Sequence, residues 1–289
     1  MDDAPSAPPV PPVPLPPGSI VTVPDRGEFF VRDSGGSGPA VLLLHGWMFG
    51  ADTNWFPVYG PLQQSGYRVI AMDHRGHGRG LRSSAPFRLA DCAADAAAVL
   101  EELGAGPAIA IGYSMGGPIA QILARNHRAS VSGVVLCATA QDWRDWYMRG
   151  FWRSMSVVRL WLGLFPVRAW RSLLRAARVP AGPEREWVAA ELSRGSTVDL
   201  AEAGRELSRY DARPWIAELR DLPSAVVVTT RDRSVPPRKQ RRLAKALGAP
   251  TFEVRADHVA VVSEREAFRA ALLAALGTVG TGGRLPVAA

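Results

Sequence analysis

The sequence feature that most constrains the fold is an apolar run of strand length, Ala108 to Ile111, that ends directly in Gly112-Tyr113-Ser114-Met115-Gly116. A helical pattern with apolar residues on one face follows at once. A serine between a strand and a helix lies at a very sharp turn, where its backbone conformation is strained. Side chains two residues before and after it would collide across that turn, so Gly112 and Gly116 suit it. The pattern predicts a serine hydroxyl raised above the edge of a sheet, at the N-terminus of a helix.

The strand, the Gly-x-Ser-x-Gly turn and the helix together resemble the nucleophile elbow of the α/β-hydrolase fold, with Ser114 as the nucleophile. The resemblance covers about residues 20–276. It implies an α/β class protein in which helices flank a mostly parallel sheet and a helical cap is inserted. The alternative is a glycine-rich turn with an incidental serine, because Gly-x-Ser-x-Gly often occurs by chance. The rest of the chain must therefore supply the other parts of a site.

Composition divides the chain into segments. Eight prolines between Pro5 and Pro17 predict an extended, solvated tail, for which the alternative role is to bind a proline-recognising partner. Strand patterns vanish from Gln141 to Pro214, and the segment reads as helices. The expected domains are a disordered proline-rich tail (1–18), an α/β-hydrolase core (19–140 and 215–276), a helical cap or lid (141–214) and a flexible, glycine-rich C-terminal tail (277–289).

Charge and cysteine content exclude several classes of protein. The net charge of the 289 residues is +7, but only two of the 34 basic residues are lysines, which indicates a compositional bias of the coding genome. We find no recognised nucleic-acid module, so no nucleic-acid partner is predicted. Cys92 and Cys137 lie far apart and predict neither a disulfide framework nor a metal site. No signal peptide is visible, so a cytoplasmic enzyme without a cofactor is expected, with its oligomeric state open.

A second motif follows another buried strand. The apolar run Val41 to Leu44 ends in His45-Gly46-Trp47. In the family that the elbow resembles, a His-Gly pair here supports the oxyanion hole, which implies the backbone N–H of Trp47 as one donor and that of Met115 as the other. The alternative is an ordinary turn between a strand and a helix.

The next strand leads into Asp73-His74-Arg75-Gly76-His77-Gly78-Arg79. Asp73, His74 and His77 invite a metal-site interpretation, but no further ligand cluster accompanies them. The resembling family carries an Asp-x-Arg-Gly-x-Gly turn at this place, in which the acidic and basic side chains brace the loop. We therefore predict no metal.

The remaining catalytic residues are predicted after the last two strands. Asp232 lies just beyond the strand Ala225 to Thr230, in what resembles the acid loop of the family. His258 is the only one of the five histidines that follows the last strand, so it is the best candidate base. The order Ser114, Asp232, His258 matches the order of the resembling fold. Asp142, which follows the strand after the elbow, is the alternative acid, while Asp257 is expected to point elsewhere.

The cap segment is rich in tryptophan and arginine, with five of the nine tryptophans between Trp143 and Trp170. One hypothesis is that an apolar stripe of the cap packs over the active site and lines an apolar substrate pocket, while a parallel row of arginines is exposed to solvent. The alternative lays this stripe on a membrane surface or lipid aggregate. The stripe comprises Val167, Trp170, Leu173, Leu174 and Ala177, and the arginine row comprises Arg168, Arg171, Arg175 and Arg178.

These residues predict acyl chemistry. A serine at position 114 argues against the carboxylate nucleophile that relatives use to open epoxides or displace halides. The expected function is a serine carboxylesterase or small lipase that acts on a small apolar acyl substrate through an acyl-enzyme. A carbon–carbon bond hydrolase or perhydrolase with the same triad is the first alternative. A binding module that kept the fold without activity is the second.

Overall fold

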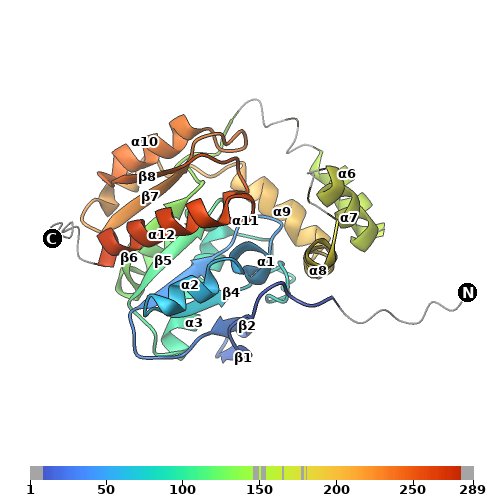
Figure 1. Cartoon of the computed structure of the whole chain (residues 1–289), viewed down its shortest axis with the longest axis horizontal. Helices are drawn as coiled ribbons and strands as arrows, with labels where there is room; N and C mark the ends of the chain where they lie inside the picture. Colours follow the sequence, from blue (N-terminus) through green and yellow to red (C-terminus); the bar gives the residue numbers. More distant parts are fainter. Residues whose placement is uncertain are drawn as a thin grey trace, which may run out of the picture.

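A computed structural model describes residues 9–145, 150, 154–164, 166–176, 179 and 181–280. In this part of the chain eight strands form one sheet, in the order β1-β2-β4-β3-β5-β6-β7-β8 (Figure 1). The pairs β1–β2 and β2–β4 are antiparallel, and the other five neighbouring pairs are parallel. The strands are β1 (Gly18–Val23), β2 (Gly27–Asp33), β3 (Ala40–Leu44), β4 (Arg68–Met72), β5 (Ala108–Tyr113), β6 (Val131–Cys137), β7 (Ser224–Thr229) and β8 (Thr251–Val254).

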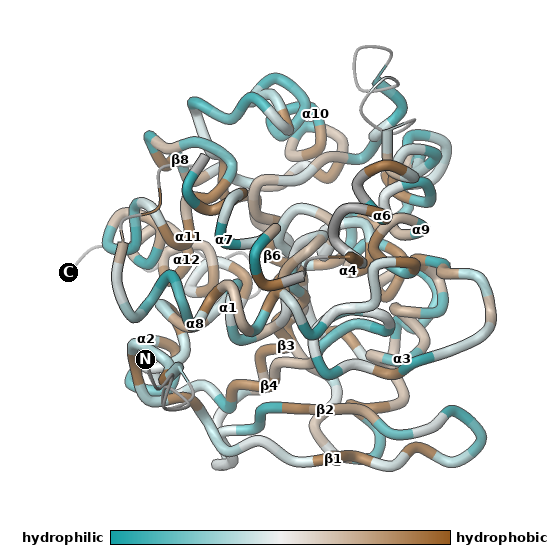
Figure 2. Tube along the Cα trace, turned by 90° about the vertical axis from the view of Figure 1, so that its right-hand side faces the viewer, coloured by the Kyte–Doolittle hydropathy of each residue, from teal (hydrophilic) through white to brown (hydrophobic). Residues whose placement is uncertain are grey.

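Helices cover both faces of the sheet, which explains why its central strands are apolar without alternation. Residues of α3, α4 and α10 pack into one core cluster, and residues of α1, α2, α11 and α12 pack into the other. Figure 2 shows hydrophobic segments along β2, β3 and β4. These helices are α1 (Ala51–Trp55), α2 (Tyr59–Gln64), α3 (Leu89–Glu102), α4 (Gly116–Asn126), α10 (Pro237–Leu247), α11 (Ala260–Ser263) and α12 (Arg265–Gly280).

Strand register places the candidate site. Leu44 at the end of β3 lies opposite Gly112 of β5, and Thr229 at the end of β7 lies opposite Val254 of β8. The carboxyl ends of parallel strands meet at one edge of a sheet, where α/β proteins bind their ligands. The loops that follow β3, β5, β7 and β8 therefore leave the sheet at the same edge.

Four described α-helices lie between β6 and β7 and gather beside that edge of the sheet (Figure 1). Part of this cap has a small core of its own, in which Trp170 and Trp187 are buried near Phe56 of the main domain. The helices are α6 (Met155–Leu164), α7 (Pro166–Ala176), α8 (Pro183–Leu192) and α9 (Thr197–Leu207). No helix in the described ranges combines the length and apolar character needed to cross a membrane.

The two expected tails differ from the structure at their inner ends. Residues 13–17 lie on the folded domain: Pro16 is buried, its carbonyl accepts a hydrogen bond from Arg32 (3.0 Å), and the Pro17 carbonyl accepts one from the Asp33 amide (3.1 Å). The prediction of disorder is wrong there, because these carbonyls find donors on β2. Helix α12 continues to Gly280 and buries Val279, so a flexible tail from 277 is also wrong. Residues 1–8 and 281–289 lie outside the described residues.

Candidate active site

The turn between β5 and α4 holds Ser114 with a positive φ of 51°, a conformation that non-glycine residues adopt rarely. A Cβ added to Gly112 would overlap the backbone of Gly116, and one added to Gly116 would overlap the carbonyl of Leu44. The turn is braced by a hydrogen bond from the Thr139 hydroxyl to the Ser114 carbonyl (2.7 Å). Strain at this one residue is therefore held by its surroundings, as at many functional sites.

Three side chains predicted from widely separated motifs meet above the sheet edge. The Oγ of Ser114 lies 2.9 Å from Nε2 of His258, and Nδ1 of His258 lies 2.8 Å from Oδ2 of Asp232. A carboxylate only accepts hydrogen bonds, so the proton of the neutral imidazole sits on Nδ1. Nε2 is then an acceptor, to which the Ser114 hydroxyl donates. In this arrangement the imidazole can accept the proton of the serine hydroxyl.

The carboxylate of Asp232 is fixed by its own loop. Its Oδ1 accepts the backbone N–H groups of Ser234 (2.9 Å) and Val235 (2.8 Å). Its Oδ2 accepts the hydroxyl of Thr229 (2.8 Å) in addition to His258. The side chain has no exposed surface, so these partners set its orientation.

Sequence reasoning missed two residues that support this group. Gln240 of α10 is fully buried, and its amide donates to Thr229 Oγ1 and the Val235 carbonyl, both at 2.8 Å, and to Asp232 Oδ2 at 3.3 Å. The hydroxyl of Tyr113 donates to the carbonyl of His258 at 2.7 Å. For Gln240 the available signal was a polar residue on the apolar face of an amphipathic helix, beside Leu243 and Leu247. Nothing in the pattern around Tyr113 pointed to this contact.

The alternative acids have other partners. Asp142 accepts a hydrogen bond from the guanidinium of Arg144 and forms an ion pair with Arg213. Asp257 is exposed and accepts the backbone N–H of Val259 at 3.1 Å. Of the carboxylates weighed as the acid, Asp232 is the one that contacts His258.

The loop after β3 is fixed from both sides. Nε2 of His45 accepts the backbone N–H of His74 (3.0 Å), which leaves the proton on Nδ1 to be donated to the Gly46 carbonyl (2.8 Å). Burial lowers the pKa of His45 to about 4, so its ring stays neutral. The Gly46 N–H donates to Oδ1 of Asn54 at 2.9 Å. A Cβ on Gly46 would lie 3.3 Å from the Cβ of Ser114, so the backbone that leads to Trp47 lies against the nucleophile.

The turn after β4 is braced by its acidic residue. Oδ1 of Asp73 accepts the N–H of Ala51 (2.6 Å), and Oδ2 accepts that of Arg79 (2.7 Å). His74 and His77 are buried beside His45. Within the described residues, no group of three or more histidine, cysteine, aspartate or glutamate side chains is arranged to hold a metal ion.

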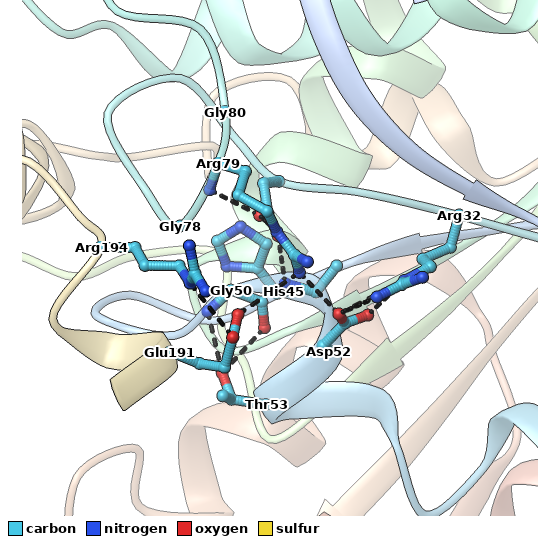
Figure 3. A network of polar contacts seen from close by, with 12 residues as sticks. Arg32, His45, Gly50, Asp52, Thr53, Gly78, Arg79, Gly80, Glu191 and Arg194 are labelled. Carbon is cyan, nitrogen blue, oxygen red and sulfur yellow. Dashed lines mark hydrogen bonds and ion pairs between the residues drawn. The ribbon is translucent and has the colours of Figure 1, made fainter. Parts of the chain in front are cut away.

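A buried charge network ties this turn to α1 (Figure 3). Asp52 is 2% exposed and pairs with Arg32 of β2 (2.7 Å) and with Arg79 (2.5 Å). Burial alone would raise the pKa of Asp52, but the hydrogen bond from Arg32 and the charge of Arg79 lower it overall. Arg79 also lies 3.5 Å from Glu191 of the cap, so the network joins the main domain to α8.

A cavity of about 550 Å³ opens over Ser114 and His258, and its described lining includes no arginine, lysine, aspartate or glutamate. Trp170, Leu173 and Leu174 of the predicted cap stripe line it. Arg168, Arg171 and Arg175 are exposed, as expected if the stripe packs over the site. Ala177 and Arg178 lie outside the described residues. Helix α6 carries a separate exposed row, the α6 apolar row, of Val157 (70%), Leu160 (63%) and Leu164 (63%).

Comparisons with known proteins agree with this architecture. The family model described as alpha/beta hydrolase fold matches residues 39–261. A non-heme haloperoxidase of Rhodococcus erythropolis is 40% identical over 118 residues, and a bifunctional esterase/perhydrolase of Acinetobacter calcoaceticus is 35% identical over 118 residues. Each match covers 40% of this chain and 42% of the relative, so the aligned part spans less than half of either protein.

A solved structure extends the likeness over nearly the whole chain. The structure of a hydrolase from Pseudomonas aeruginosa PA01 superposes with a TM-score of 0.77 at 23% identity, and covers 90% of this chain and 98% of its own. The fold class and the family resemblance predicted from the elbow are thereby confirmed. Since the family model spans most of the chain and the sheet order and flanking helices agree with it, this chain belongs to the α/β hydrolase fold family of enzymes.

Proposed function

We propose that this enzyme is a serine hydrolase that cleaves carboxylic esters or related acyl substrates. The observation that carries the proposal is the continuous hydrogen-bond chain from the Ser114 hydroxyl through His258 to Asp232. A serine hydroxyl is a weak nucleophile unless an adjacent base removes its proton. The base in turn needs a third group that fixes its tautomer and orientation.

The reaction follows from these roles. His258 Nε2 takes the hydroxyl proton as Ser114 Oγ attacks the acyl carbonyl carbon, and Asp232 stabilises the resulting imidazolium. The backbone N–H groups of Trp47 and Met115 are the proposed donors to the tetrahedral oxyanion. His258 then gives its proton to the leaving alkoxide oxygen. Water attacks the acyl-enzyme with His258 again as base, which releases the acid and restores the Ser114 hydroxyl.

The apolar cavity supports an apolar, uncharged substrate. Burying a charged group without a partner is unfavourable, and the described lining offers no arginine or lysine to pair with a carboxylate. A second candidate reaction is perhydrolysis, in which hydrogen peroxide replaces water as the attacker of the same acyl-enzyme. The names of the two sequence relatives, haloperoxidase and esterase/perhydrolase, favour it as the alternative. A carbon–carbon bond hydrolase with this triad remains a third prediction.

Contact of the cap with a lipid surface also remains a prediction. Because the stripe of α7 lines the cavity, the α6 apolar row is the surface that would make this contact. Arg159, Arg168 and Arg175 are exposed on α6 and α7 and have no acidic partner among the described residues, which suits anionic head groups.

The proposal is tested by the turnover of p-nitrophenyl esters from acetate to octanoate. Ser114→Ala and His258→Ala are each expected to lower kcat by about 10⁴ or more, because each removes a part of one catalytic unit. Ser234→Ala is the matched control. Ser234 also lines the cavity, but it contacts Asp232 through its backbone N–H, which the substitution keeps. Near-wild-type turnover in a folded Ser114→Ala protein would refute the proposal. Product analysis with added peroxide separates hydrolysis from perhydrolysis.

A further inference from the structure

Two residues in the lining of the cavity over Ser114 carry N–H groups that the proposed reaction does not use. Asn54 and Trp143 both line it, and they are 2% and 8% exposed. The Nδ2 of Asn54 and the Nε1 of Trp143 are buried and have no hydrogen-bond partner among the residues that the structure describes. Buried N–H donors are rarely left without an acceptor, so a partner from outside the chain is expected.

The amide of Asn54 has a determined orientation. Its Oδ1 accepts the Gly46 N–H at 2.9 Å, so the other end of the amide, Nδ2, is the free donor. A Cβ on Gly46 would lie 3.4 Å from this Oδ1 and 3.3 Å from the Cβ of Ser114. The amide is therefore separated from the nucleophile by little more than the Gly46 backbone.

Trp143 lies in the lining of the cavity but comes from a different segment than Asn54. It lies on the segment that leads from β6 towards the cap, and its backbone N–H donates to the Tyr210 carbonyl at 3.0 Å. That bond fixes the backbone of a residue that lines the cavity. The remaining lining is mostly apolar, and its other polar side chains include the triad members Ser114 and His258. Few other polar side chains of the lining would therefore compete with these two donors for an acceptor on a bound ligand.

We propose that Asn54 Nδ2 and Trp143 Nε1 form a donor subsite for a neutral oxygen acceptor of the substrate, separate from the scissile carbonyl. The substrate class is then an acyl ester or lactone that also bears a keto, ether or second ester oxygen. A carboxylate is disfavoured because no cationic side chain lines the described cavity. The kinetic test of this inference rests on the proposed function, because it measures ester turnover. A site built to hydrogen-bond a substrate group rejects the analogue that lacks the group much more strongly than an apolar pocket does.

The test compares p-nitrophenyl pentanoate and hexanoate with p-nitrophenyl 4-oxopentanoate and 5-oxohexanoate, each corrected for its rate of alkaline hydrolysis. The wild-type enzyme is expected to favour at least one oxo ester by about tenfold in kcat/KM. Trp143→Phe keeps an aromatic side chain of smaller size and removes the N–H donor, and is expected to reduce that preference several-fold. Asn54→Leu is also expected to reduce the preference for the oxo ester. Because this variant loses the hydrogen bond from the Gly46 N–H as well, its readout is the ratio of kcat/KM between the two substrates.

Trp170→Phe is the matched control, because it trims another indole of the cavity lining and should leave the preference unchanged. Binding of methyl 4-oxopentanoate and methyl pentanoate to Ser114→Ala, followed by tryptophan fluorescence, gives a readout that needs no turnover. Preferential binding of the oxo ester without turnover in the wild type would support the subsite and refute the proposed function. Equal kcat/KM for oxo and plain esters in the wild type, together with equal binding of the two methyl esters to Ser114→Ala, would overturn the subsite. A preference for the oxo ester that survives both Trp143→Phe and Asn54→Leu would also overturn it.

Discussion

Replacing Asp52 by asparagine tests how the buried charge network stabilises the fold. The carboxylate is 2% exposed and accepts hydrogen bonds from Arg32 at 2.7 and 3.0 Å and from Arg79 at 2.5 Å. Removing one member of a buried ion pair typically costs 3–5 kcal/mol. The side chains of Arg32 and Arg79 are 16% and 25% exposed, and Arg79 keeps Asp73 and Glu191 as partners, so we expect the lower end of this range, about 3 kcal/mol. For a chain of this size that corresponds to a drop in Tm of roughly 5–10 °C.

The free energy of unfolding is measured by urea titration. Glu253→Gln is the matched control, because Glu253 pairs with Arg241 at 2.7 Å but both side chains are about half exposed; its loss should be below about 1 kcal/mol. The Asp52 pKa is lowered overall in the fold, so its stabilisation is complete above the unfolded pKa of 3.8 and is lost as pH falls through the lower folded value. The difference between wild type and Asp52→Asn should therefore be constant from pH 5 to 7. A loss no larger than that of the control would refute this account of the network.

Three further predictions concern the acid support, the buried histidines and the cap. Gln240→Leu should lower kcat about tenfold with little change in KM, because Asp232 loses an orienting partner; an unchanged kcat in steady-state kinetics would contradict this. Burial lowers the pKa of His77 to about 3, so the unfolded chain binds the proton first as the pH falls. The urea midpoint of the wild type should therefore decrease between about pH 6.5 and about pH 4, and the midpoint of His77→Phe should decrease less. A wild-type midpoint that stays constant over that range would argue against this prediction. In flotation with anionic vesicles at low salt, the wild type should float, whereas Leu160→Ser with Leu164→Ser should not; no flotation of the wild type would end the lipid prediction.

The sequence was most informative where backbone geometry restricts residue choice. Glycines on either side of Ser114 reflect a turn in which any Cβ would overlap neighbouring backbone, and this can be recognised without a partner structure. The apolar runs of β3 and β7, which lead to His45 and Asp232, follow from burial on both faces of a parallel sheet. His258 follows the short edge strand β8, which was recognised as the last strand of the chain. Together these patterns located the sheet edge and the residues that meet there.

Side-chain contacts that depend on helix packing were beyond such patterns. Gln240 reaches Thr229 only because α10 packs beside β7 at one particular rotation, which local periodicity does not specify. Asn54 and Asp52 lie on a helix of five residues, too short to show a period at all. The proline-rich stretch was assigned by composition alone, which gave no sign that Arg32 would hold the carbonyl of Pro16.

The most direct test of the proposed nucleophile is mass spectrometry of the folded enzyme after reaction with a fluorophosphonate. The reagent phosphonylates a serine whose hydroxyl proton is removed by a neighbouring base. We predict one adduct, on the peptide that contains Ser114, and a much slower reaction in Asp232→Asn, because the His258 ring then loses the acceptor that fixes its tautomer. Absence of any adduct on the folded wild type, or an adduct on Ser234 in place of Ser114, would contradict the assignment.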